Sequence, residues 1–217
     1  MLVAIEGGDG AGKATAAAEV ARQLNAAGRS ACVLSFPRYG DTAGGWALGE
    51  MLGERLPRAV SPRAAAVLYA LDRMESRGHL LTAAASHEVV VLDRYIASNL
   101  AYQAARGPAD EAAALMRWIW TLETVQFALP PPDLSVYLAT PVDVARRQIA
   151  QKRQRDYTDA TFDVNEADLA LQARVRANYA ALAAADYAGR WTTVDTVRDG
   201  GMRTPGEIAE KVVAAIR

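Results

Sequence analysis

A glycine-rich segment near the N-terminus constrains the fold of this chain more than any other feature. It follows a predicted strand at residues 2–6 and opens a predicted helix at residues 13–26. A turn of this kind lets successive backbone N–H groups point at phosphate oxygens, and the helix N-terminus adds the positive end of its dipole. The segment therefore predicts a phosphate-binding P-loop. Its members are Gly7, Gly8, Asp9, Gly10, Ala11, Gly12, Lys13, Ala14 and Thr15.

The P-loop departs from the strict pattern at one position. Ser or Thr usually follows the lysine and ligates Mg²⁺, but this chain has Ala14 there and its next hydroxyl only at Thr15. An alanine cannot ligate a metal, so a metal ligand must come from elsewhere. Lys13 keeps its expected role as a mobile positive charge for the β- and γ-phosphates of a nucleotide.

Short apolar runs alternate with longer alanine-rich stretches along the rest of the chain. The runs predict strands at 2–6, 31–35, 88–93, 134–139 and 191–195, and the stretches predict helices at 13–26, 62–85, 111–129, 141–154 and 166–185. Most of the runs are apolar on both faces, as in a buried parallel sheet. We therefore expect an α/β fold of the P-loop NTPase type, with a five-stranded parallel sheet and helices on both faces. We expect one domain over residues 1–217.

The overall composition limits the partners of this chain. Its net charge is −1, so neither nucleic acid nor an anionic membrane is an expected partner. A single cysteine, Cys32, excludes an internal disulfide. No apolar run approaches the roughly 18 residues of a membrane span, and the N-terminus reads as a strand and not as a signal peptide. The cytoplasm is the expected location.

Two further clusters follow predicted strands, where ligands of open α/β sheets bind. Phe36-Pro37-Arg38-Tyr39-Gly40 combines an aromatic face for a base with an arginine for a phosphate, although an ordinary turn with a core Phe is an alternative. Asp93-Arg94-Tyr95 places a carboxylate suited to Mg²⁺ beside an arginine suited to the acceptor phosphate, although a structural ion pair is an alternative.

A charged segment at about 152–163 lies between two predicted helices and contains Arg153 and Arg155. Charge runs are often solvated helix faces. The P-loop has no arginine of its own, so we favour a lid whose arginines close on the phosphates. P-loops also serve GTPases, but the chain has no Asn-Lys-x-Asp motif. These features together favour a nucleoside monophosphate kinase that uses ATP and Mg²⁺.

The ordered set of motifs resembles the bacterial thymidylate kinase family, in its actinobacterial form. The resemblance spans residues 2 to about 195 and is carried by the P-loop, Phe36-Pro37-Arg38, Leu71-Asp72-Arg73, Asp93-Arg94-Tyr95, Ser98-Asn99-Ala101-Tyr102, Pro132-Asp133-Leu134 and the lid arginines. It implies in-line transfer of the γ-phosphoryl group of ATP to dTMP, without a phosphoenzyme. It also implies a homodimer.

The resemblance assigns roles to individual residues. The dTMP-binding set is Asp9, Phe36, Arg38, Tyr39, Tyr69, Arg73, Arg94, Ser98, Asn99 and Tyr102. The catalytic set is Asp9, Lys13, Arg94, Arg153 and Arg155, and the metal ligands are Asp9, Asp93 and Glu166. In this assignment Tyr69 stacks on thymine, Arg73 and Asn99 read the base, and Tyr102 crowds a 2′-hydroxyl.

Two alternatives remain open from the sequence. A deoxynucleoside kinase, or a kinase for another monophosphate, would keep the P-loop and change the residues that read the base. A catalytically silent nucleotide-binding regulator is suggested only by Ala14.

Overall fold

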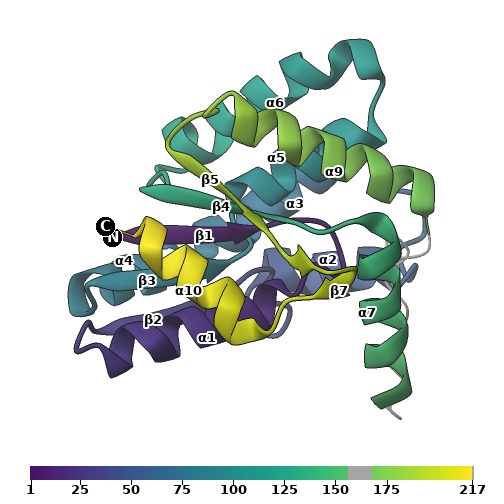
Figure 1. Cartoon of the computed structure of the whole chain (residues 1–217). Coiled ribbons are helices and arrows are strands. Elements are labelled where there is room, and N and C mark those ends of the chain that lie inside the picture. Colours follow the sequence, from purple (N-terminus) through teal and green to yellow (C-terminus); the bar gives the residue numbers. More distant parts are fainter. Residues whose placement is uncertain (156–167, 217) are drawn as a thin grey trace.

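The core of the protein is a five-stranded parallel sheet. The computed structural model describes residues 1–155 and 168–216, with side chains for 1–150 and 168–216. The strands are β1 (Leu2–Glu6), β2 (Ala31–Ser35), β3 (Val89–Asp93), β4 (Leu134–Ala139) and β5 (Trp191–Asp195), in the order β2-β3-β1-β4-β5 (Figure 1). All five predicted strands are confirmed, and β3 begins one residue later than the sequence indicates.

The strands are apolar on both faces because each face is covered by helices. In β1, Val3 and Ile5 belong to one hydrophobic cluster, whereas Leu2 and Ala4 belong to the other. Successive side chains of a strand point to opposite faces, so a doubly covered strand needs apolar residues at every position. β3 satisfies the same condition with the run Val89-Val90-Val91-Leu92, which is fully buried.

Two helical layers enclose the sheet. Helices α1 (Lys13–Ala26) and α10 (Pro205–Ala215) pack on one face (Figure 1). The other face carries α3 (Pro62–Glu75), α4 (Arg77–Ser86), α5 (Ile96–Arg106), α6 (Ala112–Thr121) and α9 (Leu169–Ala184). α2 (Ala43–Leu52) packs on α3. The predicted α/β architecture with helices on both faces is confirmed.

Several helices differ from the sequence prediction. The single helix expected at 62–85 is two helices, α3 and α4, which meet at Ser76. The helix expected at 111–129 consists of a 3₁₀ turn (Ala109–Glu111), α6 and a π-helical turn, η2 (Leu122–Gln126). The sequence analysis did not assign α2, α5, α10 or the short hairpin of β6 (Val197–Arg198) and β7 (Gly201–Met202).

Helix α7 (Val142–Arg155) leaves the carboxyl-terminal edge of the sheet and projects away from it (Figure 1). The predicted helix at 141–154 is thus confirmed, and it includes the first residues of the segment expected to form a lid. Residues 156–163 of that segment lie outside the described residues. Among the helices that the structure describes, none is long and apolar enough to cross a membrane.

Candidate functional site

The P-loop turns tightly between β1 and α1. Gly10 and Gly12 have φ values of 75° and 81°, in the left-handed region that glycine adopts without a steric penalty. A Cβ atom at Gly10 would also overlap the carbonyl oxygen of Ala145 in the first turn of α7. Glycine at this position therefore permits both the turn and the direct contact between the P-loop and α7.

Lys13 lies buried at the start of α1, and its Nζ donates a hydrogen bond of 2.8 Å to the carbonyl oxygen of Gly8. Burial and the nearby charge of Arg94 lower the pKa of Lys13 to about 7, against the opposing attraction of Asp9, Asp93 and Glu6. A bound phosphate would supply the negative charge that this ammonium group needs. The role of Lys13 toward the β- and γ-phosphates stays a prediction.

Asp9 links the P-loop to Arg94, which follows β3, and to Gln172 of α9. Its carboxylate accepts hydrogen bonds from Arg94 and from Nε2 of Gln172, the latter at 2.6 Å, and its backbone N–H donates to Oε1 of Gln172 at 3.2 Å. Burial alone would raise its pKa, but the charges of Arg94 and Lys13 lower the pKa to about 2. Asp9 is therefore a fixed anion at neutral pH.

Arg94 follows β3 with a φ of 65°, an uncommon conformation for a residue with a side chain. Its backbone N–H donates to the carbonyl oxygen of Ile5 at 3.1 Å, which holds this turn against β1. The guanidinium pairs with Asp9 and lies 5.4 Å from the ring centroid of Tyr102. Because this geometry aims a fixed cation at the P-loop, Arg94 is suited to bind a second phosphate group.

Beneath this pair lies a buried carboxylate that the sequence analysis did not select. Glu6 accepts hydrogen bonds from the backbone N–H of Tyr95 at 2.9 Å, from Ser98 Oγ at 2.7 Å and from the Tyr179 hydroxyl at 3.1 Å. Burial raises its pKa above the usual value. Ser98, predicted to bind dTMP, thus has its hydroxyl directed at Glu6 in this structure.

Helix α9 supplies two more side chains that the sequence analysis did not select. Gln172 contacts Asp9 as described above, and Arg176, one turn later, donates to the backbone carbonyl oxygens of Thr140, Gln172 and Asp9 at 3.2 to 3.4 Å. Polar residues four apart in an alanine-rich helix face the same side. The spacing of Gln172 and Arg176 could have indicated that both side chains face the same way. It could not have indicated that they contact Asp9 of the P-loop.

The residues predicted for the acceptor phosphate and for the walls of the base site have different environments. Phe36 is buried and packs against Tyr95 with ring centroids 6.0 Å apart. Arg38 forms a salt bridge of 2.9 Å with Asp41 at the surface, and Tyr39 is 46% exposed. Tyr69 is half-buried in α3. A phosphate at Arg38 would therefore compete with the carboxylate of Asp41.

The residues predicted to read the base lie together in the interior. Arg73 is 1% exposed and forms two hydrogen bonds with Glu123, which the sequence analysis did not select. Asn99 also contacts Glu123 and has a buried Oδ1 without a partner among the described residues. Gln103, one turn further along α5, is fully buried, and neither atom of its amide has a partner within the part of the chain that the structure describes.

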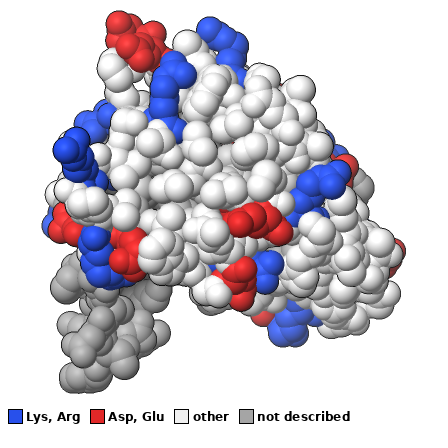
Figure 2. Space-filling model, turned by 180° about the vertical axis from the view of Figure 1, so that it is seen from behind, with Lys and Arg blue, Asp and Glu red and all other residues white. Residues whose placement is uncertain are grey.

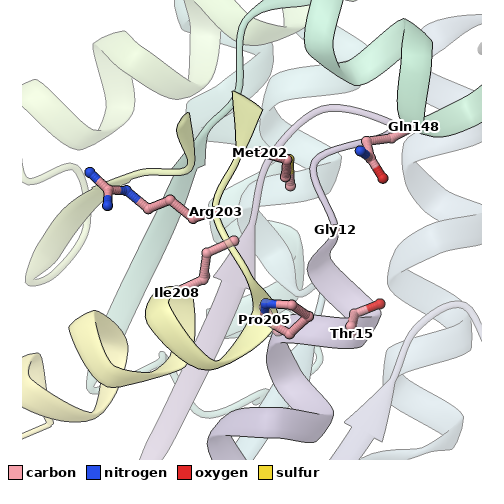
Figure 3. A pocket seen from close by; sticks show the side chains of 8 residues that line it. Gly12, Thr15, Gln148, Met202, Arg203, Pro205 and Ile208 are labelled. Atoms are coloured by element: carbon pink, nitrogen blue, oxygen red, sulfur yellow. The ribbon is translucent and has the colours of Figure 1, made fainter. Parts of the chain in front are cut away.

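A pocket of about 200 Å³ lies beside the P-loop. Figure 3 shows Met202, Pro205 and Ile208 on one side, facing Thr15 and Gln148 on the other. These residues come from β7, α10, α1 and α7, so elements distant in sequence build one mainly apolar recess next to Gly12. Such a recess fits the flat face of a nucleobase whose phosphates lie on the P-loop.

Two of the predicted metal ligands lie near Lys13, and the third lies outside the described residues. Asp9 and Asp93 both act on the charge of Lys13, and Oδ1 of Asp93 is buried without a hydrogen-bond partner among the described residues. Carboxylate oxygens are the donors that Mg²⁺ prefers, so the residues present fit this ion. Over 1–150 and 168–216, no group of three His, Cys, Asp or Glu side chains is arranged to hold a metal.

The positions of three other predicted site side chains, those of Arg153, Arg155 and Glu166, lie outside the described part of the structure. Arg153 and Arg155 belong to the last turn of α7, but their side chains lie outside the described ones. Glu166 lies in the segment that the structure does not describe.

Comparison with known proteins gives a consistent family assignment. The family model for thymidylate kinase matches residues 5–199. The thymidylate kinase of Mycobacterium tuberculosis is 41% identical over 202 residues, which cover 93% of this chain and 94% of the relative. That of Leifsonia xyli is 34% identical, with coverage of 91% and 88%, and that of Thermomicrobium roseum is 36% identical, with coverage of 89% and 86%. The chain therefore belongs to the thymidylate kinase family.

Proposed function

We propose that this protein phosphorylates dTMP to dTDP with ATP. The observation that carries the proposal is the meeting of Lys13 on the P-loop with the Arg94–Asp9 pair at the end of β3. A kinase for monophosphates needs one cationic site for the donor phosphates and another for the acceptor phosphate, close enough for in-line transfer. The match to the thymidylate kinase family supports dTMP as the acceptor.

The chemistry proposed for these residues is positioning and neutralisation of charge. The P-loop N–H groups, the N-terminus of α1 and Lys13 hold the β- and γ-phosphates of ATP. Arg94, with Arg38 after release from Asp41, holds the phosphate of dTMP, while Asp9 fixes Arg94 and orients the acceptor side. Arg153 and Arg155 supply further positive charge to the transferring group. No covalent intermediate is needed, because the two phosphates meet directly.

Mg²⁺ is proposed to bind through Asp9, Asp93 and Glu166, in place of the hydroxyl that Ala14 lacks. When bound, Mg²⁺ neutralises the charge that develops on the phosphate oxygens. The buried Oδ1 of Asp93, which has no partner among the described residues, supports this assignment.

The nucleosides are assigned to two separate sites. The adenine of ATP is proposed to occupy the pocket of Met202, Pro205 and Ile208, because this pocket adjoins Gly12 of the P-loop. Thymine is proposed to stack on Tyr69 near Phe36 and to meet Arg73 and Asn99. Tyr102, under the guanidinium of Arg94, is placed to crowd a ribose 2′-hydroxyl.

A substrate panel tests the proposal directly. ADP release is measured with ATP, Mg²⁺ and each of dTMP, dUMP, dCMP, dGMP, dAMP, UMP and thymidine. We expect dTMP to have the highest kcat/KM, and dUMP to lose about 10- to 200-fold because it lacks one methyl group. Preferred turnover of thymidine would identify a nucleoside kinase instead. Binding of dTMP without turnover of any acceptor would support the regulator.

The family resemblance also suggests a homodimer, and the surface offers a place for it. Figure 2 shows a broad face, on the side where α2 and α3 lie behind the sheet in Figure 1, whose centre is largely free of charged side chains. Trp46 of α2 and Val67 of α3 are 63% and 39% exposed. We expect light scattering to give a molar mass of twice the 23.2 kDa chain mass. The double variant Trp46→Glu, Val67→Glu should have the mass of a monomer. A monomeric wild-type protein would contradict this.

The same proposal treats residues 1–217 as one kinase domain that works in the cytoplasm on small-molecule substrates, without nucleic acid or membrane partners.

A further inference from the structure

A buried ion pair joins α3 to the π-helical turn η2, and neither of its two hydrogen bonds involves the P-loop. Nε and Nη2 of Arg73 donate to Oε2 and Oε1 of Glu123 at 2.5 and 2.7 Å, and the two side chains are 1% and 0% exposed. Burying two charges costs desolvation energy that the attraction between them often only offsets, so stability alone is a weak reason for such a pair. The pair therefore calls for another explanation, and its neighbours provide one.

The π-helical turn η2 brings Glu123 into the interior. The backbone N–H of Phe127 bonds to the carbonyl oxygen of Leu122, five residues back, and that of Leu129 bonds to the carbonyl oxygen of Glu123. In this turn Glu123 is fully buried, whereas Val125 is 70% exposed. π turns are rare and are frequent at functional sites. The turn thus aims one carboxylate at both Arg73 and Asn99.

Glu123 also determines which way the amide of Asn99 points. Nδ2 of Asn99 lies 2.9 Å from Oε1 of Glu123 and 3.0 Å from the carbonyl oxygen of Ala66. Both neighbours are acceptors only, so the nitrogen of the amide must face them. The oxygen, Oδ1, then faces the other way, and it is buried with no partner among the described residues. An unpaired buried acceptor is energetically costly, which favours a ligand that donates to it.

The amide of Gln103 provides a contrast on the same helix. No described residue bonds to either end of it, so it can turn to suit a donor or an acceptor. Gln103 therefore cannot impose a direction on a hydrogen bond. Asn99 and Arg73 can impose a direction on a hydrogen bond, because Glu123 fixes the orientation of both side chains.

We propose that Glu123 is a positioning residue that makes Asn99 present an acceptor and Arg73 present a donor, and so selects bases with a carbonyl at C4 and a proton at N3. This inference rests on the proposed function. With one N–H of Nε and one of Nη2 bound to Glu123, the remaining N–H groups of Nη1 and Nη2 are left to donate to a base carbonyl. Thymine and uracil match this pair of groups at adjacent positions. Cytosine mismatches at both, because its N3 accepts and its C4 amino group donates.

The ratio of kcat/KM for dUMP to that for dCMP isolates this effect, because neither base carries the thymine methyl group. A site built around fixed polar partners rejects a mismatched analogue strongly, by up to about 10⁴-fold. In Glu123→Gln, the new amide NH₂ can donate to Oδ1 of Asn99, which turns the Asn99 nitrogen toward the base. We expect the dUMP-to-dCMP ratio to fall at least about 10-fold, with KM for ATP within about twofold of wild type.

Two controls separate positioning from loss of structure. Val212→Ala truncates a fully buried residue of α10 in the opposite hydrophobic cluster, and it should lower Tm without changing the ratio. Glu123→Asp keeps the carboxylate and should retain more of the ratio than Glu123→Gln. A Glu123→Gln variant with lower Tm but an unchanged ratio would show a purely structural role and overturn the inference.

A wild-type measurement keeps the inference testable if the variants fail to fold. Methylation at N3 of dUMP removes the donor that Oδ1 of Asn99 requires, so this analogue should be as poor a substrate as dCMP. Turnover equal to that of dUMP would overturn the inference. If the wild-type protein prefers dTMP but keeps its base ratio in Glu123→Gln, only this inference fails; if it phosphorylates no monophosphate, the proposed function fails.

Discussion

Replacing Lys13 with methionine is expected to lower kcat by about 10³-fold, by analogy with the loss of a transition-state cation in other phosphoryl-transfer enzymes. The reason is that Lys13 is the P-loop cation proposed to hold the β- and γ-phosphates of ATP. Methionine has a similar length and fills the same space without the charge. The effect should fall mainly on kcat in the ADP-release assay, because the charge matters most as the phosphoryl group transfers.

The same substitution is expected to stabilise the protein in the absence of nucleotide. The pKa of Lys13 is lowered from 10.5 to about 7, so the folded state binds the proton less tightly than the unfolded state does. Stability therefore rises as pH increases from 7 to 10.5, and the penalty is largest below pH 7. Removing the lysine removes a penalty of a few kcal/mol and loses one hydrogen bond to Gly8, worth about 1 kcal/mol.

Urea unfolding at pH 6.5 and pH 10 measures this effect. We expect Lys13→Met to be about 2 kcal/mol more stable than wild type at pH 6.5 and to show a smaller difference at pH 10. Glu19→Gln, at a half-buried position on α1, is the control, since Glu19 has a pKa of about 2 and stays ionised across this range. A Lys13→Met protein that is less stable at both pH values would contradict the buried-charge explanation.

Replacing Asp9 with alanine is expected to abolish turnover, with a loss of at least about 10³-fold, and to leave the fold intact. The carboxylate holds Arg94 through one oxygen and Gln172 through the other, so its loss frees the cation that is proposed to bind the acceptor phosphate. It also removes one of the proposed Mg²⁺ ligands. Near-normal turnover of Asp9→Ala would refute the assignment of Asp9 to the catalytic site.

The effect on stability should have the opposite sign to that of Lys13. The pKa of Asp9 falls from 3.8 to about 2 on folding, so its ionised form contributes stability above pH 3.8 that is lost as pH falls from 3.8 toward 2. That contribution is on the order of 2 kcal/mol at neutral pH. Asp9→Ala should therefore unfold at lower urea concentration than wild type at pH 7. Asp9→Asn keeps the shape and tests the charge alone.

The strands and the P-loop could be predicted from the sequence because local rules determine them. A strand buried on both faces must be apolar throughout, and the apolar run at 89–92 meets that condition. The glycines of the P-loop indicate a tight turn with positive φ angles, a conformation that glycine adopts most easily. Lys13, Arg94 and Asp9 follow from their places at strand ends, where an open α/β sheet binds its ligands.

The partners of these residues could not be predicted, because they are set by packing between distant segments. Gln172 is 163 positions away from Asp9 along the chain, and Glu123 is 50 positions away from Arg73. Glu123 is also hidden by the π turn, since an ordinary α-helix at 111–129 would point its residues in other directions. The break at Ser76 is followed by Gly78, but a single glycine inside a helical pattern is tolerated, so the sequence analysis predicted one helix where the structure has α3 and α4.

The close approach of Gly10 to the carbonyl oxygen of Ala145 couples the position of the P-loop to the direction of α7. Arg155, the last residue of α7, lies ten positions after Ala145, which at about 1.5 Å per residue is a distance of about 15 Å along the helix. A helix turns as a rigid rod, so a small tilt at the P-loop end becomes a displacement several times larger at the far end. Because residue 10 has no side chain, the backbone of the P-loop lies directly against the backbone of α7 at Ala145, with no flexible side chain between the loop and the helix.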